Sequence, residues 1–128
     1  MKKNLFIVTL IIVLSWSFTG YAGESTNTSI DKELKTIWGS MINRLSARDI
    51  EGALGYFTYS SRWRYKEEFT LIEEKLPEIF SKMQEIESVY IKGDEAKYRV
   101  RIRNTHDEYT QYIWFRKDIF GRWKIDKF

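Results

Sequence analysis

The chain has no cysteine and only one proline and one histidine among its 128 residues. Without cysteine there are no disulfides, no thiolate metal sites and no cysteine to carry a lipid after an export signal. The single histidine, His106, falls in a run of turn residues, which favours a turn role over catalysis. No phosphate loop, zinc-ligand spacing, nucleophile elbow or dinucleotide fingerprint occurs. We therefore expect neither a cofactor nor a metal.

The excess of positive charge is small. The formal net charge is +3, and two of the cations, Lys2 and Lys3, lie in a segment that we expect to be removed. This balance does not favour a nucleic-acid partner, because such domains are usually strongly basic. Apolar residues, in contrast, make up 43% of the chain and aromatic residues 16%, which is enough for the core of one domain.

The N-terminus has the layout of a secretory signal peptide. The two lysines precede an apolar run over residues 5–14, and Gly20-Tyr21-Ala22 places small residues at a cleavage site. The run is shorter than the ~20 residues that span a bilayer, which favours cleavage over an uncleaved anchor. We predict a signal peptide over residues 1–22, a flexible leader over 23–28 and one domain over 29–128, exported to the periplasm or beyond the cell.

Helical spacing of apolar residues predicts a first helix over residues 29–47, with Trp38 as a core anchor. Asp49 is the expected N-cap of a second helix over residues 50–59. Its two glycines are poor helix formers and indicate either close packing or a loose helix.

Residues 60–65 are expected to form a connector. In this segment Arg62 and Arg64 flank Trp63, either as an aromatic plug with solvated cations or as a contact for an anion. A third helical stretch is predicted over residues 66–84, with a kink or a new helix at Pro77. Its glutamates are expected to form a solvated face.

The second half of the domain shows the alternation typical of strands with one buried face. From Ala96 to Arg103, apolar and cationic residues alternate without exception. A three-residue turn with Gly121 in the left-handed conformation would place Asp118 opposite Arg122, and Phe115 opposite Ile125. The expected strands cover residues 86–92, 95–103, 108–117 and 122–128.

This register assigns each strand residue to one of two faces. Expected on the buried face are Tyr98, Val100, Ile102, Ile113, Phe115, Trp123 and Ile125. Expected on the exposed face are Lys97, Arg99, Arg101, Arg103, Tyr112, Trp114, Arg116, Arg122 and Lys124. Asp126 is the only acid that this register places among them. The face is therefore either a surface for an anionic partner, a solvated face, or one neutralised by the acidic helix of another copy.

Two short segments resemble the NTF2-like, or SnoaL-like, superfamily. The segment Ala53-Leu54-Gly55-Tyr56-Phe57 is similar to the "A-L-x-x-F" element that follows the first helix of that family. Trp123-Lys124-Ile125, after a glycine turn, is similar to the closing "W-x-I" strand. With the order of helices and strands, the resemblance covers nearly all of the mature chain. It implies an α+β cone in which N-terminal helices pack into a bent, four-stranded antiparallel sheet.

The superfamily includes isomerases, dehydratases, cyclases and many non-catalytic binding modules, so the fold alone does not assign a function. Glu87, beside Val89 and Ile91, and Tyr98 are the candidates for polar groups inside the cone. Our leading hypothesis is an exported, non-catalytic binding or accessory domain whose exposed face engages an anionic envelope ligand or protein. The alternatives are a small pocket enzyme of isomerase, dehydratase or hydrolase type, and a module that forms homodimers through the sheet.

Overall fold

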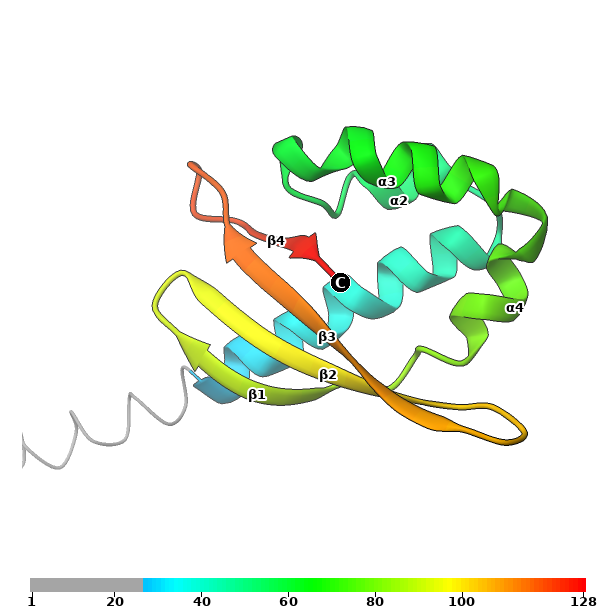
Figure 1. The fold of residues 1–128 in the computed structure, drawn as a ribbon. Coiled ribbons are helices and arrows are strands. Elements are labelled where there is room, and N and C mark those ends of the chain that lie inside the picture. The colour runs from blue at the N-terminus through cyan, green and yellow to red at the C-terminus, as the bar shows by residue number, and fades with distance from the viewer. Residues whose placement is uncertain (1–26) are drawn as a thin grey trace, which may run out of the picture. The chain divides into compact units, whose positions relative to one another are not determined.

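The structure is a computed structural model, and it describes residues 27–128. In this part of the chain, a run of helices is followed by four strands (Figure 1). The expected signal peptide and most of the leader lie outside these residues. Residues Glu33–Phe128 form one compact unit, and the following description concerns that unit. Its helices precede a four-stranded antiparallel sheet, so the fold is α+β.

The helices follow the apolar spacing of the sequence, with changes at their ends. The first helix covers residues 27–46. It is followed by α2 (Ile50–Leu54), α3 (Tyr59–Leu71), a 3₁₀ turn (Glu73–Lys75) and α4 (Leu76–Ser81). A new helix at Pro77 is confirmed, since proline occupies the first turn of α4 and needs no amide partner there.

The cap of α2 is confirmed, whereas its predicted length is wrong. The Asp49 carboxylate accepts a hydrogen bond of 3.0 Å from the Gly52 amide. The same carboxylate lies where a side chain at Gly52 would be, so this glycine reflects close packing. The helix ends at Leu54, because the chain then turns to pair with a strand.

The expected connector over residues 60–65 is also wrong, because these residues form the first turns of α3. Trp63 is 72% exposed and does not plug the core. The apolar residues that α3 buries are Tyr65 and Phe69, four positions apart on the opposite side of the helix.

The sheet has the order β1-β2-β3-β4, with each strand antiparallel to its neighbour. Its strands are β1 (Glu87–Lys92), β2 (Glu95–Arg103), β3 (Glu108–Lys117) and β4 (Trp123–Lys127). The predicted last turn is confirmed: Gly121 has φ +75°, the Asp118 amide bonds to the Arg122 carbonyl, and Phe115 lies opposite Ile125. His106 lies exposed in the turn between β2 and β3.

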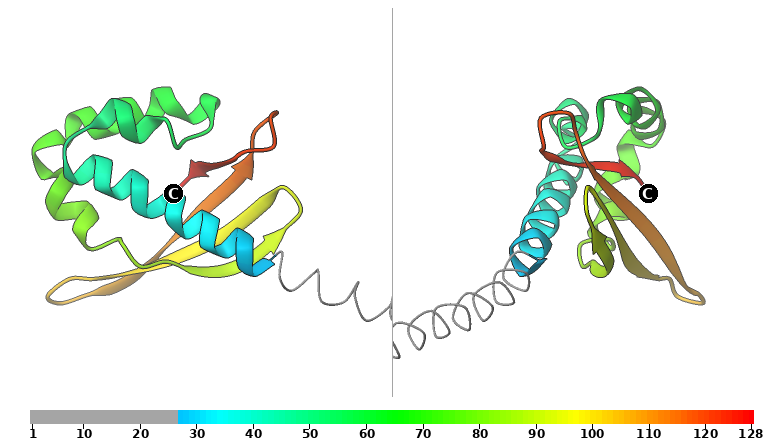
Figure 2. Two further views of the ribbon diagram at one scale, coloured as in Figure 1. Left: turned by 180° about the vertical axis from the view of Figure 1, so that it is seen from behind. Right: turned by 90° about the vertical axis from the view of Figure 1, so that its left-hand side faces the viewer.

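One face of the sheet is buried. Residues 33–46 of the first helix cross this face, as the view from behind in Figure 2 shows. In the described part of the chain, no helix covers the opposite face (Figures 1 and 2). Trp38 is confirmed as a core anchor, because it is fully buried and its indole N–H donates a 2.7 Å hydrogen bond to the Met83 carbonyl. All seven residues expected on the buried face are buried: Tyr98, Val100, Ile102, Ile113, Phe115, Trp123 and Ile125.

The segment between α2 and α3 is joined to β4. Phe57 forms a parallel bridge with Ile125. The Ile125 amide donates to the Tyr56 carbonyl and the Thr58 amide donates to the Ile125 carbonyl, both at 2.8 Å. This pairing places the start of α3 beside the turn between β3 and β4.

Candidate functional site

An ordered row of aromatic and cationic residues crosses the exposed face of the sheet. The strand pairings place Tyr90 opposite Lys97, Lys97 opposite Trp114, and Trp114 opposite Lys127. Each of the four strands thus contributes one side chain. We call these four residues the Trp114 row. The sequence alternation predicted Lys97 and Trp114 on this face. Tyr90 joins them through the regular pairing beside the turn between β1 and β2, whereas Lys127 does so because a bulge in β4 shifts the register.

The two lysines of the row lie over aromatic rings. The Lys97 ammonium is 4.3 Å from the ring centre of Tyr112 and 5.4 Å from that of Trp114. The Lys127 ammonium is 4.8 Å from the Trp114 ring centre. These are cation–π distances. Within residues 27–128, no carboxylate lies within ion-pair distance of either lysine. The row therefore presents positive charge that nearby acids do not offset.

The arginines of the same face are paired with acids, against expectation. Glu87 contacts both Arg99, at 3.1 Å, and Arg101, at 3.5 Å. The further pairs are Arg103 with Glu108 at 3.6 Å and Arg116 with Asp126 at 3.2 Å. The prediction that Asp126 is the only strand acid among these cations is thus wrong. Exposed pairs stabilise a fold little, but they reduce the local charge, so the arginines alone do not form an unbalanced basic surface.

Glu87 was expected inside the cone and lies on the exposed face. The reason is a β-bulge between Ser88 and Tyr90, which leaves Val89 without a partner on β2. On one side of the bulge Tyr90 opposes Lys97, and on the other Ser88 opposes Tyr98. The extra residue reverses the alternation, because one added residue moves every later side chain to the other face. Glu87 consequently lies opposite Arg99.

The electrostatic state of Glu87 follows from this position. A hydrogen bond from Arg99 lowers the pKa of the Glu87 carboxyl below its usual value, and the charges of Arg99 and Arg101 add to the effect. The carboxylate is therefore held in its charged form, as a partner for cations. A general acid would require the opposite shift.

Tyr98, the second candidate for the interior, is fully buried on the inner face. Its ring packs edge-on against Phe115, with ring centres 5.3 Å apart. Glu87 and Tyr98 thus lie on opposite faces of the sheet. The structure does not bring together the two residues on which the enzyme alternative depended.

A cleft of about 640 Å³ opens between the start of α3 and the turn from β3 to β4. We call it the basic cleft, because its lining includes five cations and a single acid, Asp118. The sequence suggested an anion contact for Arg62 and placed Arg122 and Lys124 on the exposed face, but it did not connect them. The cations that line the cleft are Arg62, Arg116, Lys117, Arg122 and Lys124.

Two further searches concern residues 27–128 only. No helix there is long and apolar enough to cross a membrane. In the same residues, no three acidic or histidine side chains gather as a metal site would require. In comparisons of the whole sequence with known proteins, no model of a protein family matches this chain, and no curated protein matches it.

Proposed function

We infer that the domain is a non-catalytic binding module that engages an anionic partner through the exposed face of its sheet. The observation that carries this proposal is the Trp114 row, where two lysines lie over aromatic rings and have no acid beside them in the described chain. Flat rings offer apolar contact area, and the ammonium groups attract negative charge. The contact is centred on the lysines and not on the arginine alternation, because the arginines already have carboxylate partners.

The partner belongs to the cell envelope if the chain is exported. The signal-peptide layout of residues 1–22 supports export, and its cleavage would leave Gly23 as the first residue. N-terminal sequencing of the protein recovered from the medium or the envelope tests this step. Retention of Met1 in a membrane fraction would contradict it.

Membership of the NTF2-like superfamily is part of the same proposal. Its support comes from the two segments that resemble the family. Leu54 and Phe57 of the first segment and Trp123 and Ile125 of the second are all buried. Phe57 and Ile125 form the bridge between the segment after α2 and β4. The two similar segments therefore meet at one place in the core, which is a stronger argument than either short motif alone.

Binding at the Trp114 row is tested by removing its charge. The probes are immobilised polyglutamate, for an acidic protein surface, and phosphatidylglycerol vesicles, for anionic headgroups. Lys97→Gln combined with Lys127→Gln should lose retention on at least one probe. Retention of the wild type should fall with salt, because exposed charges are screened over ~8–10 Å at physiological ionic strength.

The matched control is Arg103→Gln combined with Arg64→Gln. It removes the same number of cations from exposed, ion-paired positions outside the row. If the control and the double lysine variant bind equally well, the row is not the contact. Sedimentation of both variants shows whether the face instead joins two copies of the chain.

A further inference from the structure

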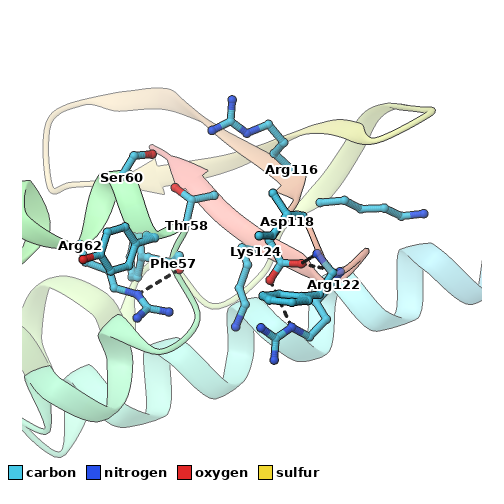
Figure 3. A pocket seen from close by; sticks show the side chains of 12 residues that line it. Phe57, Thr58, Ser60, Arg62, Arg116, Asp118, Arg122 and Lys124 are labelled. Atoms are coloured by element: carbon cyan, nitrogen blue, oxygen red, sulfur yellow. Dashed lines mark hydrogen bonds and ion pairs between the residues drawn. The ribbon is translucent and has the colours of Figure 1, made fainter.

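The basic cleft has features of a second binding site, separate from the Trp114 row. None of the four residues of the row lines it. Its walls come from the start of α3 and from the turn between β3 and β4, as Figure 3 shows. Its volume of about 640 Å³ falls in the range of pockets that hold one small molecule, ~300–1,000 Å³.

Two arginines of the cleft, Arg62 and Arg122, each use one guanidinium nitrogen in a hydrogen bond and leave the other two nitrogens for a ligand. The Nε of Arg62 donates to the Phe57 carbonyl at 3.4 Å, and the Nε of Arg122 donates to the Asp118 carboxylate at 3.1 Å. For the described residues, neither arginine has a hydrogen-bond acceptor at its terminal nitrogens. A guanidinium anchored in this way loses less freedom when it binds, and its open fork matches a carboxylate or a phosphate.

Lys124 lies between these two arginines in the view of Figure 3. Its ammonium donates to the Gly55 carbonyl at 2.8 Å, which fixes its position and leaves two protons for a ligand. Burial lowers the pKa of Lys124, and the charges of Arg122 and Arg62 lower it further. Lys124 therefore lies close enough to both arginines to be repelled by them.

Acids offset this charge only in part. Asp118 is bonded to Arg122 and also accepts hydrogen bonds from the Phe120 and Arg122 amides, so it serves the turn. Within residues 27–128, neither Arg62 nor Lys124 has a carboxylate at ion-pair distance. A bound anion would offset the repulsion of Lys124 by Arg62 and Arg122.

The cleft also has an apolar wall. Phe120 is 73% exposed and Tyr59 87% exposed, although both are large aromatic residues. Phe120 packs beside the Arg122 guanidinium, and Tyr59 lies beside that of Arg62, at 5.1 and 5.8 Å from ring centre to guanidinium carbon. Arg62 and Arg122 thus each have an aromatic ring next to the guanidinium.

We propose that the basic cleft binds a small organic oxyanion, with the carboxylate or phosphate held by Arg62, Lys124 and Arg122 and an apolar ring held by Phe120. The charged part of the ligand lies among the three cations. Its ring packs against the exposed aromatic side chains at the mouth of the cleft.

Titration calorimetry of the purified protein with two ring-bearing probes tests the proposal. Phenyl phosphate carries the phosphate, and phthalate carries two carboxylates. We expect at least one of them to bind. Arg62→Gln and Lys124→Gln should each weaken that binding about tenfold or more, as expected for loss of a hydrogen bond to a charged group. Whichever probe binds more tightly identifies the oxyanion.

Arg64→Gln is the matched control. It lies on the same helix as Arg62, pairs with Glu68 at 3.2 Å and does not line the cleft. It should bind the probe like the wild type, and so should the double lysine variant of the Trp114 row. If neither probe binds, or if Arg64→Gln weakens binding as much as Arg62→Gln, the proposal is overturned.

A second variant keeps the test decisive if Lys124→Gln unfolds. Phe120→Ala alters an exposed turn residue, so the fold should persist. This variant should have a several-fold lower affinity for phenyl phosphate and the same affinity as the wild type for inorganic phosphate. Equal affinity of Phe120→Ala and the wild type for phenyl phosphate would overturn the apolar part of the site.

Discussion

The backbone amide of Thr58 donates a hydrogen bond of 2.8 Å to the carbonyl of Ile125. This contact attaches the segment before α3 to the last strand. The Thr58 hydroxyl strengthens it by donating to the Asp126 carboxylate at 3.0 Å. The joint determines how far Arg62, on α3, lies from Lys124, on β4, and so gives the basic cleft its shape.

Replacing Thr58 with valine should weaken this joint. Thr58→Val keeps the shape of the side chain but removes the hydroxyl from a residue that is 6% exposed. We expect a loss of about 1 kcal/mol of unfolding free energy, the usual value for one hydrogen bond. Urea denaturation measures it. Thr70→Val, on the exposed side of α3, is the control and should change stability less.

The two tryptophans of the last strands should respond differently to truncation. Trp123 is 5% exposed on the inner face, whereas Trp114 lies on the outer face. Trp123→Ala should cost about 3–5 kcal/mol, as large-to-small core substitutions do. Trp114→Ala should cost much less and instead affect binding. Equal losses in denaturant melts would mean that the assignment of faces is wrong.

Deleting Val89 should remove the bulge without moving Glu87. The deletion joins Ser88, which opposes Tyr98, directly to Tyr90, which opposes Lys97, so Glu87 stays opposite Arg99 and keeps its ion pair. Thermal melts should show only small losses for the deletion and for Val89→Ala, because this side chain is unpaired and 46% exposed. Adding Glu87→Leu to the deletion should not raise the stability, because it removes the carboxylate that contacts Arg99 and Arg101. A large loss for the deletion that Glu87→Leu rescues would show that Glu87 had turned inward and would contradict this register.

The stability of the domain should fall at alkaline pH because of Tyr65. Burial raises the pKa of its hydroxyl, although the hydrogen bond to Phe128 and the charge of Arg64 act in the opposite direction. The folded protein then holds the proton more tightly than the unfolded chain. This contribution is fully present below pH ~10, the ordinary tyrosine value, and is lost as the pH rises through the raised pKa.

Denaturant melts at increasing pH, compared with those of Tyr65→Phe, isolate this contribution. The difference in stability between the two proteins should shrink as the pH rises above ~10. A difference that stays constant with pH would show that the hydroxyl does not titrate with unfolding.

The two long strands could be predicted from the sequence, whereas the bulge in β1 could not. The bounds of β2 and β3 agree with the prediction, because strict alternation over Ala96–Arg103 and a glycine turn together leave one register. The bulge at Val89 has no mark in the sequence, since it adds one residue to a strand that also satisfies plain alternation. The position of Glu87 therefore could not be predicted.

The start of α3 was missed for a related reason. Tyr59 and Trp63 are large, apolar and exposed, so the apolar pattern at this end of the helix does not mark a buried stripe. The Trp114 row could be predicted for Lys97 and Trp114, which lie in the regular strands. The basic cleft could not, because it depends on the parallel bridge between Phe57 and Ile125, residues far apart in the sequence.

The two irregular features of the sheet also bear on aggregation. Among the described strands, β1 and β4 form the edges, and an open edge can recruit a strand of another chain. The bulge at Val89 interrupts the regular hydrogen-bonding ladder of β1. At the other edge, the segment from Tyr56 to Thr58 occupies the amide and carbonyl of Ile125. Each edge thus carries a local obstacle to edge-to-edge pairing, and the domain gains protection against fibre-like assembly without proline in either strand.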